Sequence, residues 1–92
     1  MSANKFLAAQ PSQDDLAKAL GDAGSAHHEY EQVILGGKRD EQWPGFYAAY
    51  TLGRIGDFAA PSELTQWLED APTGEIWAIA AAEYVISRLA VH

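Results

Sequence analysis

The sequence contains no cysteine, which excludes disulfide bonds, thiolate metal sites and a cysteine nucleophile. It also has no apolar run approaching the roughly 18 to 20 residues that span a bilayer. The first ten residues, "MSANKFLAAQ", include one lysine and no apolar stretch of signal-peptide length. We therefore expect a soluble cytoplasmic protein whose stability comes from apolar packing.

Basic residues are few and scattered. Six Lys and Arg stand against thirteen Asp and Glu, which gives a formal net charge of −7. Lys38 and Arg39 are the only adjacent basic pair, so no local patch offsets the negative charge. Because phosphate backbones and anionic lipid headgroups are repelled by such a chain, we expect neither nucleic acid nor a membrane as a partner.

The pattern of apolar residues predicts an all-α protein. The chain has 92 residues, of which 48% are hydrophobic and 11% aromatic, enough for one globular domain. No segment alternates with the period of two that is typical of strands. We expect a mobile N-terminal arm at residues 1–11, able to dock through Phe6 and Leu7, and a single helical domain at residues 12–92.

The first helix is predicted to begin after Ser12, whose hydroxyl can cap it, and to end at Gly36-Gly37. One face carries residues spaced three and four apart, as in a packed helical seam. These are Leu16, Leu20, Ala23, His27, Tyr30 and Ile34. Gly21 and Gly24 weaken the middle of this helix, so two shorter helices remain an alternative.

Three more helices are expected. The second covers residues 43–55, with Trp43, Tyr47, Tyr50 and Arg54 sharing one face. The third begins at Pro61 and presents Leu64, Trp67 and Leu68. The fourth, capped by Thr73, runs from Ile76 to Val91 and is apolar almost all round, which is typical of a buried helix. The expected fold is a compact four-helix arrangement around this central apolar C-terminal helix.

The segment "AHHEYE", residues 26–31, is the strongest candidate for chemistry. His27 and Glu31 lie one helical turn apart and could share a cation. A metal site needs three or four ligands, so Asp40, Glu41, Asp57 or Glu83 would have to complete it from elsewhere. No H-E-x-x-H motif occurs. We therefore expect a hydrogen-bonded core histidine, with no metal and no cofactor.

Other catalytic arrangements are not found. The residues after the histidines, Glu29 to Glu31, would repel a phosphoryl group, which disfavours a phosphorelay role. There is no G-x-S-x-G motif, and "LGGK" lacks the spacing of a phosphate-binding loop. We assign no catalytic residue and do not expect enzyme activity from this chain alone.

The aromatic side chains offer three interpretations. They can form the core with their polar tips at the rim, they can line a ligand pocket, or they can contribute to a protein interface. In the pocket interpretation, His27, Tyr50 and Arg54 would converge on a small anionic or aromatic molecule. The full candidate ligand-binding set is His27, His28, Tyr30, Glu31, Trp43, Tyr47, Tyr50 and Arg54.

The segments "AHHEYE" and "DEQWPGFYAAY", with the polar loop between them, resemble a group of small bacterial helical proteins without an assigned activity. Similar segments are also appended to glyoxalase-like proteins. The resemblance covers roughly residues 14–58 and implies an accessory or partner-binding role beside an enzyme. Our leading hypothesis is a small acidic binding module with a protein partner or a second copy of itself. The alternative is a small-molecule or metal-dependent enzyme site on the His27, Glu31, Tyr50 and Arg54 face.

Overall fold

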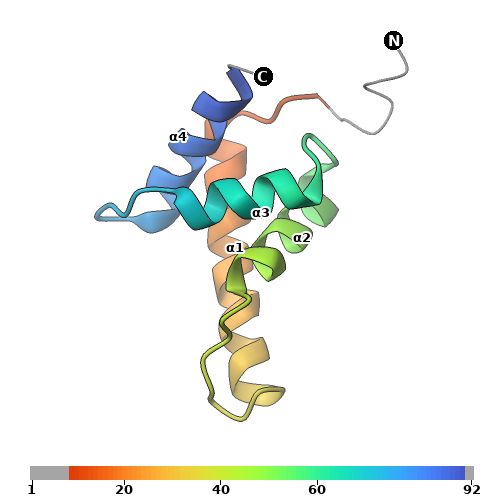
Figure 1. The fold of residues 1–92 in the computed structure, drawn as a ribbon, viewed down its shortest axis with the longest axis vertical. Helices are drawn as coiled ribbons and strands as arrows, with labels where there is room; N and C mark the ends of the chain where they lie inside the picture. The colour runs from red at the N-terminus through yellow and green to blue at the C-terminus, as the bar shows by residue number, and fades with distance from the viewer. Residues whose placement is uncertain (1–8, 91–92) are drawn as a thin grey trace.

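The computed structural model describes residues 9–90, which form four helices packed together (Figure 1). They are α1 (Gln13–Val33), α2 (Trp43–Ile55), α3 (Pro61–Asp70) and α4 (Trp77–Ala90). Residues 9–90 contain no strand, so the all-α prediction is confirmed. Most of the predicted N-terminal arm, including Phe6 and Leu7, lies outside the described residues.

The longest helix, α1, is the element on which α2 and α4 both pack. The hydroxyl of Ser12 accepts a hydrogen bond of 3.0 Å from the amide of Asp15, so the predicted N-cap is confirmed. The helix is continuous through Gly21 and Gly24, and the alternative of two shorter helices is wrong. Its inward stripe is also shorter than predicted, because Ile34 is 65% exposed beyond the helix end.

The second helix has the predicted bounds but buries a different face. Its buried residues are Pro44, Ala48, Thr51 and Leu52. The residues predicted to share one face lie at the rim of the buried one: Trp43, Tyr47 and Tyr50 are half-buried and Arg54 is exposed. The small side chains on the buried face let the backbones of neighbouring helices approach, which leaves the large rings to cover the edges.

The core lies between the four helices. Leu16 and Leu20 of α1 belong to one buried cluster with Leu52 of α2. The residues that the sequence placed on α3, Leu64, Trp67 and Leu68, are part of the same cluster. The side of α4 that joins this cluster is made of Ala81, Ala82 and Val85. Burying such a cluster removes apolar surface from water at about 25 cal/mol per Å², which is the main force holding the helices together.

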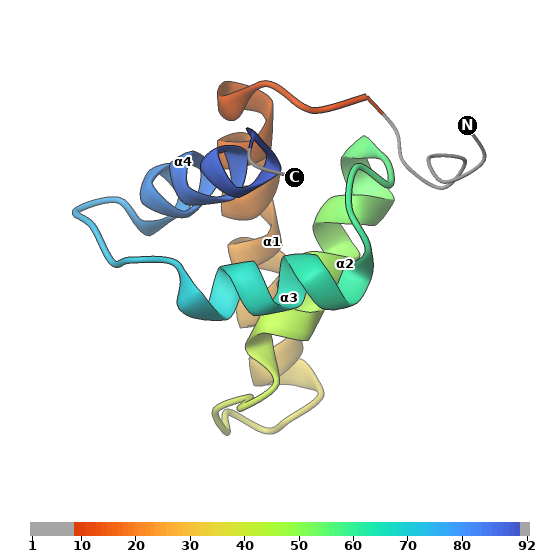
Figure 2. The same ribbon diagram turned by 45° about the horizontal axis from the view of Figure 1, so that its top comes forward.

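The fourth helix is not the centre of the fold. It packs on α1 and α3, and no close backbone approach joins it to α2. Figure 2 shows α4 at one side of the molecule, and Ile79 on its outer face is 50% exposed. The helix also begins later than predicted: the carbonyl of Ile76 accepts its first helical hydrogen bond, so Thr73 is not its cap. The apolar composition of α4 led us to expect burial on all sides. Much of that composition is alanine, and only Ala81, Ala82 and Val85 of this helix are fully buried.

No helix within residues 9–90 combines the length and the apolar character that a membrane crossing requires.

Candidate functional site

His27 is buried on α1, with 6% of its surface exposed, and its imidazole reaches the loop that precedes α2. Its Nε2 lies 2.9 Å from Oδ2 of Asp40. A carboxylate oxygen can only accept, so Nε2 carries the hydrogen in this pair. The first residue of the pair comes from a helix and the second from a loop, so the contact fixes one element against the other.

Glu31 ties down the same loop by a second contact. Its Oε2 accepts a hydrogen bond of 2.8 Å from the backbone amide of Asp40 and lies 4.0 Å from Nε2 of His27. The other carboxylate oxygen of Asp40, Oδ1, accepts from the amide of Gln42 at 2.9 Å, which is an Asx turn leading into α2. We call His27, Glu31 and Asp40 the His27 cluster.

Electrostatics favour the charged form of Asp40 in this cluster. The hydrogen bond from His27 lowers the pKa of Asp40 below its ordinary value of 3.8, and the amide of Gln42 and the nearby imidazole act in the same direction. Partial desolvation raises the pKa of Asp40 but has a smaller influence than either hydrogen bond. The carboxylate therefore stays ionised and keeps both of its hydrogen bonds.

Aromatic rings surround the imidazole. The ring of Phe46 lies 4.9 Å from it in an edge-to-face arrangement, Tyr47 lies at 5.3 Å, and Tyr30 stacks at 6.4 Å, measured between ring centroids. Burial, followed by the charge of Glu31, raises the pKa of Tyr47 above its ordinary 10.0. Phe46 was not among the predicted site residues, although it follows Pro44 by two positions in "WPGFY".

The same ring network connects α2 to α4. Trp43, Tyr47 and Trp77 pack edge to face on one another, with centroid separations between 5.3 and 5.7 Å. Such pairs contribute about 0.5–1.5 kcal/mol each beyond the area they bury. These rings therefore act as packing between helices, the first of the three interpretations that the sequence left open.

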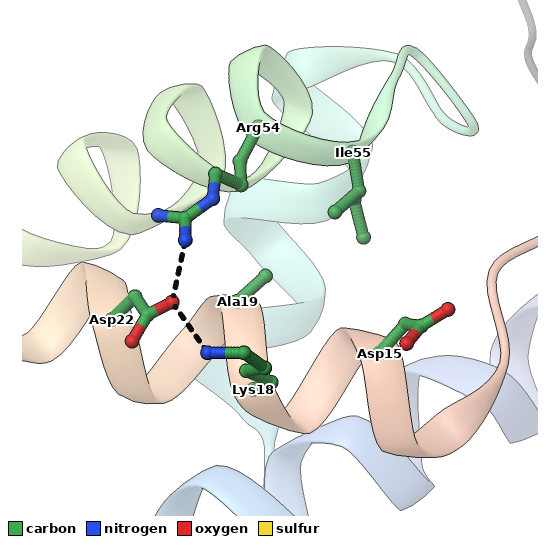
Figure 3. Close-up of a pocket in the computed structure, with 6 residues that line it drawn as sticks. All are labelled: Asp15, Lys18, Ala19, Asp22, Arg54 and Ile55. Atoms are coloured by element: carbon green, nitrogen blue, oxygen red, sulfur yellow. Dashed lines mark hydrogen bonds and ion pairs between the residues drawn. The ribbon is translucent and has the colours of Figure 1, made fainter.

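Arg54 lies apart from the His27 cluster, in a groove between α1 and α2 (Figure 3), and Tyr50 borders a second hollow beside it. One guanidinium nitrogen of Arg54 donates to the Tyr50 hydroxyl at 2.8 Å, and the other lies 3.0 Å from Oδ2 of Asp22. Lys18 lies 3.5 Å from the same oxygen. Asp22 therefore lies between the side chains of Lys18 and Arg54. Neither Asp22 nor Lys18 was among the predicted site residues.

The groove contains a cavity of about 150 Å³. Its lining consists of Asp15, Lys18, Ala19, Asp22, Arg54 and Ile55. Beside it, Ser25, Ala26, Glu29 and Tyr50 border a shallower depression that shares Lys18, Asp22 and Arg54. His27 lines neither hollow, so the predicted convergence of His27, Tyr50 and Arg54 on one pocket is not seen in these two.

The proposed metal ligands are only partly brought together. Asp40 does reach His27 and Glu31, but Glu41 pairs with Arg39 at 3.7 Å, and Asp57 and Glu83 are exposed on other elements. Within residues 9–90 no group of three or more His, Asp or Glu is arranged to hold a metal ion. His28, the second histidine of the segment, is exposed on α1.

Two pairs of large aliphatic side chains are the features that the sequence patterns did not predict. Val33 and Ile34, at the end of α1, are 70% and 65% exposed. Ile76 and Ile79, at the start of α4, are 59% and 50% exposed. For Ile76 and Ile79 the available signal was the absence of any charged residue between Glu75 and Glu83, which marks more apolar surface than α1 and α3 cover.

No family model, no curated protein and no solved structure matches this chain. The resemblance to small bacterial helical proteins therefore stays a prediction.

Proposed function

We propose that this protein is a small acidic accessory module that binds another protein and does not itself catalyse a reaction. The observation that carries the proposal is the exposure of Val33, Ile34, Ile76 and Ile79, each at least half open to solvent. Single exposed aliphatic residues are ordinary on protein surfaces. Here they occur in two pairs, and burying an aliphatic side chain against a partner contributes about 1.5–3 kcal/mol when burial is complete.

The polar side chains of the candidate site support a non-catalytic role. A general base needs a free lone pair directed at a substrate, and a metal ligand needs one directed at the metal ion. Asp40 instead uses both carboxylate oxygens inside the fold, and Glu31 accepts from the backbone. The groups that resemble a catalytic set are thus occupied in holding the loop between α1 and α2.

The proposal is tested by affinity capture from a lysate of the source organism, followed by reconstitution with the purified partner. We expect a partner that binds the native protein and is lost from the double variant Ile76→Asn/Ile79→Asn or from Val33→Asn/Ile34→Asn. Matched controls are His28→Ala and Gln32→Ala, exposed substitutions on α1 that should leave capture unchanged. If both aliphatic double variants retain every partner of the native protein, the proposal is wrong.

A second candidate function is binding of a small anionic molecule in the groove between α1 and α2. It rests on the cavity beside Arg54, where Lys18 and Arg54 both approach the carboxylate of Asp22 and Asp15 supplies a second carboxylate to the lining. Native mass spectrometry of the purified protein, compared with its denatured mass, tests this alternative. A retained small molecule that is lost in Arg54→Met would support it, and an unliganded native mass would reject it.

A further inference from the structure

We infer that the corner between α3 and α4 binds a basic segment of another protein that carries aliphatic side chains among its Lys and Arg residues. The α3–α4 corner consists of the exposed residues Glu69, Asp70, Glu75, Ile76, Ile79 and Glu83. The inference rests on the proposed function and adds the chemistry of the partner. It also selects one of the two exposed aliphatic pairs as the contact.

The two isoleucines are close enough on α4 to act together. Ile76 immediately precedes the helix, and Ile79 and Glu83 follow at spacings of three and four residues, so all three lie on one helical face. The buried residues Ala81, Ala82 and Val85 occupy another side of α4. The two isoleucines are therefore directed away from the core, and each is at least half exposed. Figures 1 and 2 both place the end of α3 and the start of α4 at one edge of the molecule, joined by a projecting loop.

The part of the chain that contains these isoleucines carries charges of one sign. Residues 56–87 include six acidic side chains and no Lys or Arg. These are Asp57, Glu63, Glu69, Asp70, Glu75 and Glu83, and all except Glu63 are exposed. A surface of one sign attracts the opposite charge and accelerates its association. An apolar pair bordered by carboxylates is therefore complementary to an amphipathic basic segment.

The same charges disfavour other occupants of this corner. In a two-fold symmetric dimer the corner would meet its own copy, which brings carboxylates against carboxylates. Nucleic acid and anionic lipid are repelled for the same reason. The second aliphatic pair is a poor counterpart on another copy, because Lys38 and Arg39 are the only basic residues that follow it closely in the sequence and Arg39 already pairs with Glu41 at 3.7 Å.

The test measures binding of fluorescently labelled peptides by anisotropy. The probe is an amphipathic helical peptide of Leu and Lys. Two matched peptides serve as controls: one replaces every Leu by Ser and the other replaces every Lys by Glu. We expect the Leu/Lys peptide to bind at least about tenfold more tightly than either control, and its affinity to fall as salt is raised.

Variants locate the contact. Ile76→Asn/Ile79→Asn should weaken the Leu/Lys peptide about tenfold, whereas Val33→Asn/Ile34→Asn, which changes an equally exposed pair, should alter it less than about twofold. The milder double variant Glu75→Gln/Glu83→Gln should reduce both the affinity for the peptide and the dependence of that affinity on salt. It provides a second test in case Ile76→Asn/Ile79→Asn disturbs folding. The control for this charge change is Asp14→Asn/Glu29→Gln.

Three results would overturn the inference. They are equal binding of the Ser/Lys peptide, loss of binding in Val33→Asn/Ile34→Asn alone, and a self-association in sedimentation velocity that Ile76→Asn/Ile79→Asn abolishes. The second result leaves the proposed function standing, because a protein would still bind through an exposed aliphatic pair. The proposed function fails only if neither pair affects capture of a partner.

Discussion

Nε2 of His27 and Oδ2 of Asp40 lie 2.9 Å apart, joining two residues that are thirteen positions apart in the sequence. The contact links α1 to the loop before α2, and Glu31 reinforces it from the next helical turn. His27 and Glu31 of "AHHEYE" are thereby explained as a clamp, formed with Asp40, that holds the connection between α1 and α2, whereas His28 and Glu29 are exposed. The following predictions test this clamp, the turn beside it and the core.

Removing the imidazole should destabilise the fold. His27→Ala leaves Asp40 without its donor and opens a cavity beside Phe46 and Tyr47, so we expect the free energy of unfolding to fall by about 2–3 kcal/mol. Urea denaturation followed by circular dichroism measures the change. The control is His28→Ala, an exposed position that should change stability by less than about 0.5 kcal/mol. Equal effects at the two histidines would contradict the clamp.

Acid should weaken the clamp through Asp40. Because the folded-state pKa of Asp40 lies below its ordinary 3.8, this carboxylate stabilises the fold above that pH. The contribution is lost as the pH falls through the folded-state pKa. The stability difference between the native protein and Asp40→Asn should therefore shrink from about pH 5 to about pH 2, as measured by urea midpoints. A difference that stays constant over this range would show that Asp40 has no lowered pKa.

A glycine-to-alanine substitution should destabilise the protein in the turn after α1 and stabilise it within the helix. Gly36 has φ of 64° and Gly37 has φ of 87°, in the left-handed region that favours glycine. We expect Gly37→Ala to lower the free energy of unfolding by about 1 kcal/mol. Gly21→Ala is the matched control, because Gly21 is helical with open space around it, and it should raise stability by about 0.5–1 kcal/mol. Thermal melts that give both changes the same sign would refute this account.

The core contains a hydroxyl whose removal should be favourable. Thr51 on α2 is 0% exposed, and its buried Oγ1 has no hydrogen-bond partner within residues 9–90. Thr51→Val keeps the shape and removes the uncompensated desolvation, so we expect stability to rise by about 1 kcal/mol. At Thr65, whose Oγ1 donates to the carbonyl of Pro61 at 2.7 Å, the same substitution should give no gain. A loss of stability in Thr51→Val would indicate a partner for that hydroxyl.

Local signals in the sequence predicted most of the helix boundaries. Ser12 before an apolar stripe, Pro61 in a first turn, and Gly56 at a helix end each act through neighbouring backbone groups, which sequence spacing describes directly. The sequence left open which face of α2 is buried, because both Tyr47 and Ala48 suit a helix interior by type. Only the closeness of the neighbouring helices favours the smaller side chain there.

Contacts between distant residues were less predictable. His27 and Glu31 could be placed on one helix face from their spacing, but the partner that completes the cluster comes from a loop whose path depends on Gly36 and Gly37. Asp40 was one of four acids proposed as candidate metal ligands. Nothing in one sequence distinguishes it from Glu41, its immediate neighbour. The exposure of Ile76 and Ile79 was missed for a similar reason, since apolar composition does not specify which helices cover a surface.

The most direct test of the account is an NMR titration of the ¹⁵N-labelled protein with the Leu/Lys peptide, in which backbone amide shifts report the contact residue by residue. The account predicts that shifts concentrate between Glu75 and Glu83 and at the end of α3, while the amides of His27, Glu31 and Asp40 stay in place. Shifts centred instead on the His27 cluster, or on Tyr50 and Arg54, would contradict it and identify those residues as the binding site.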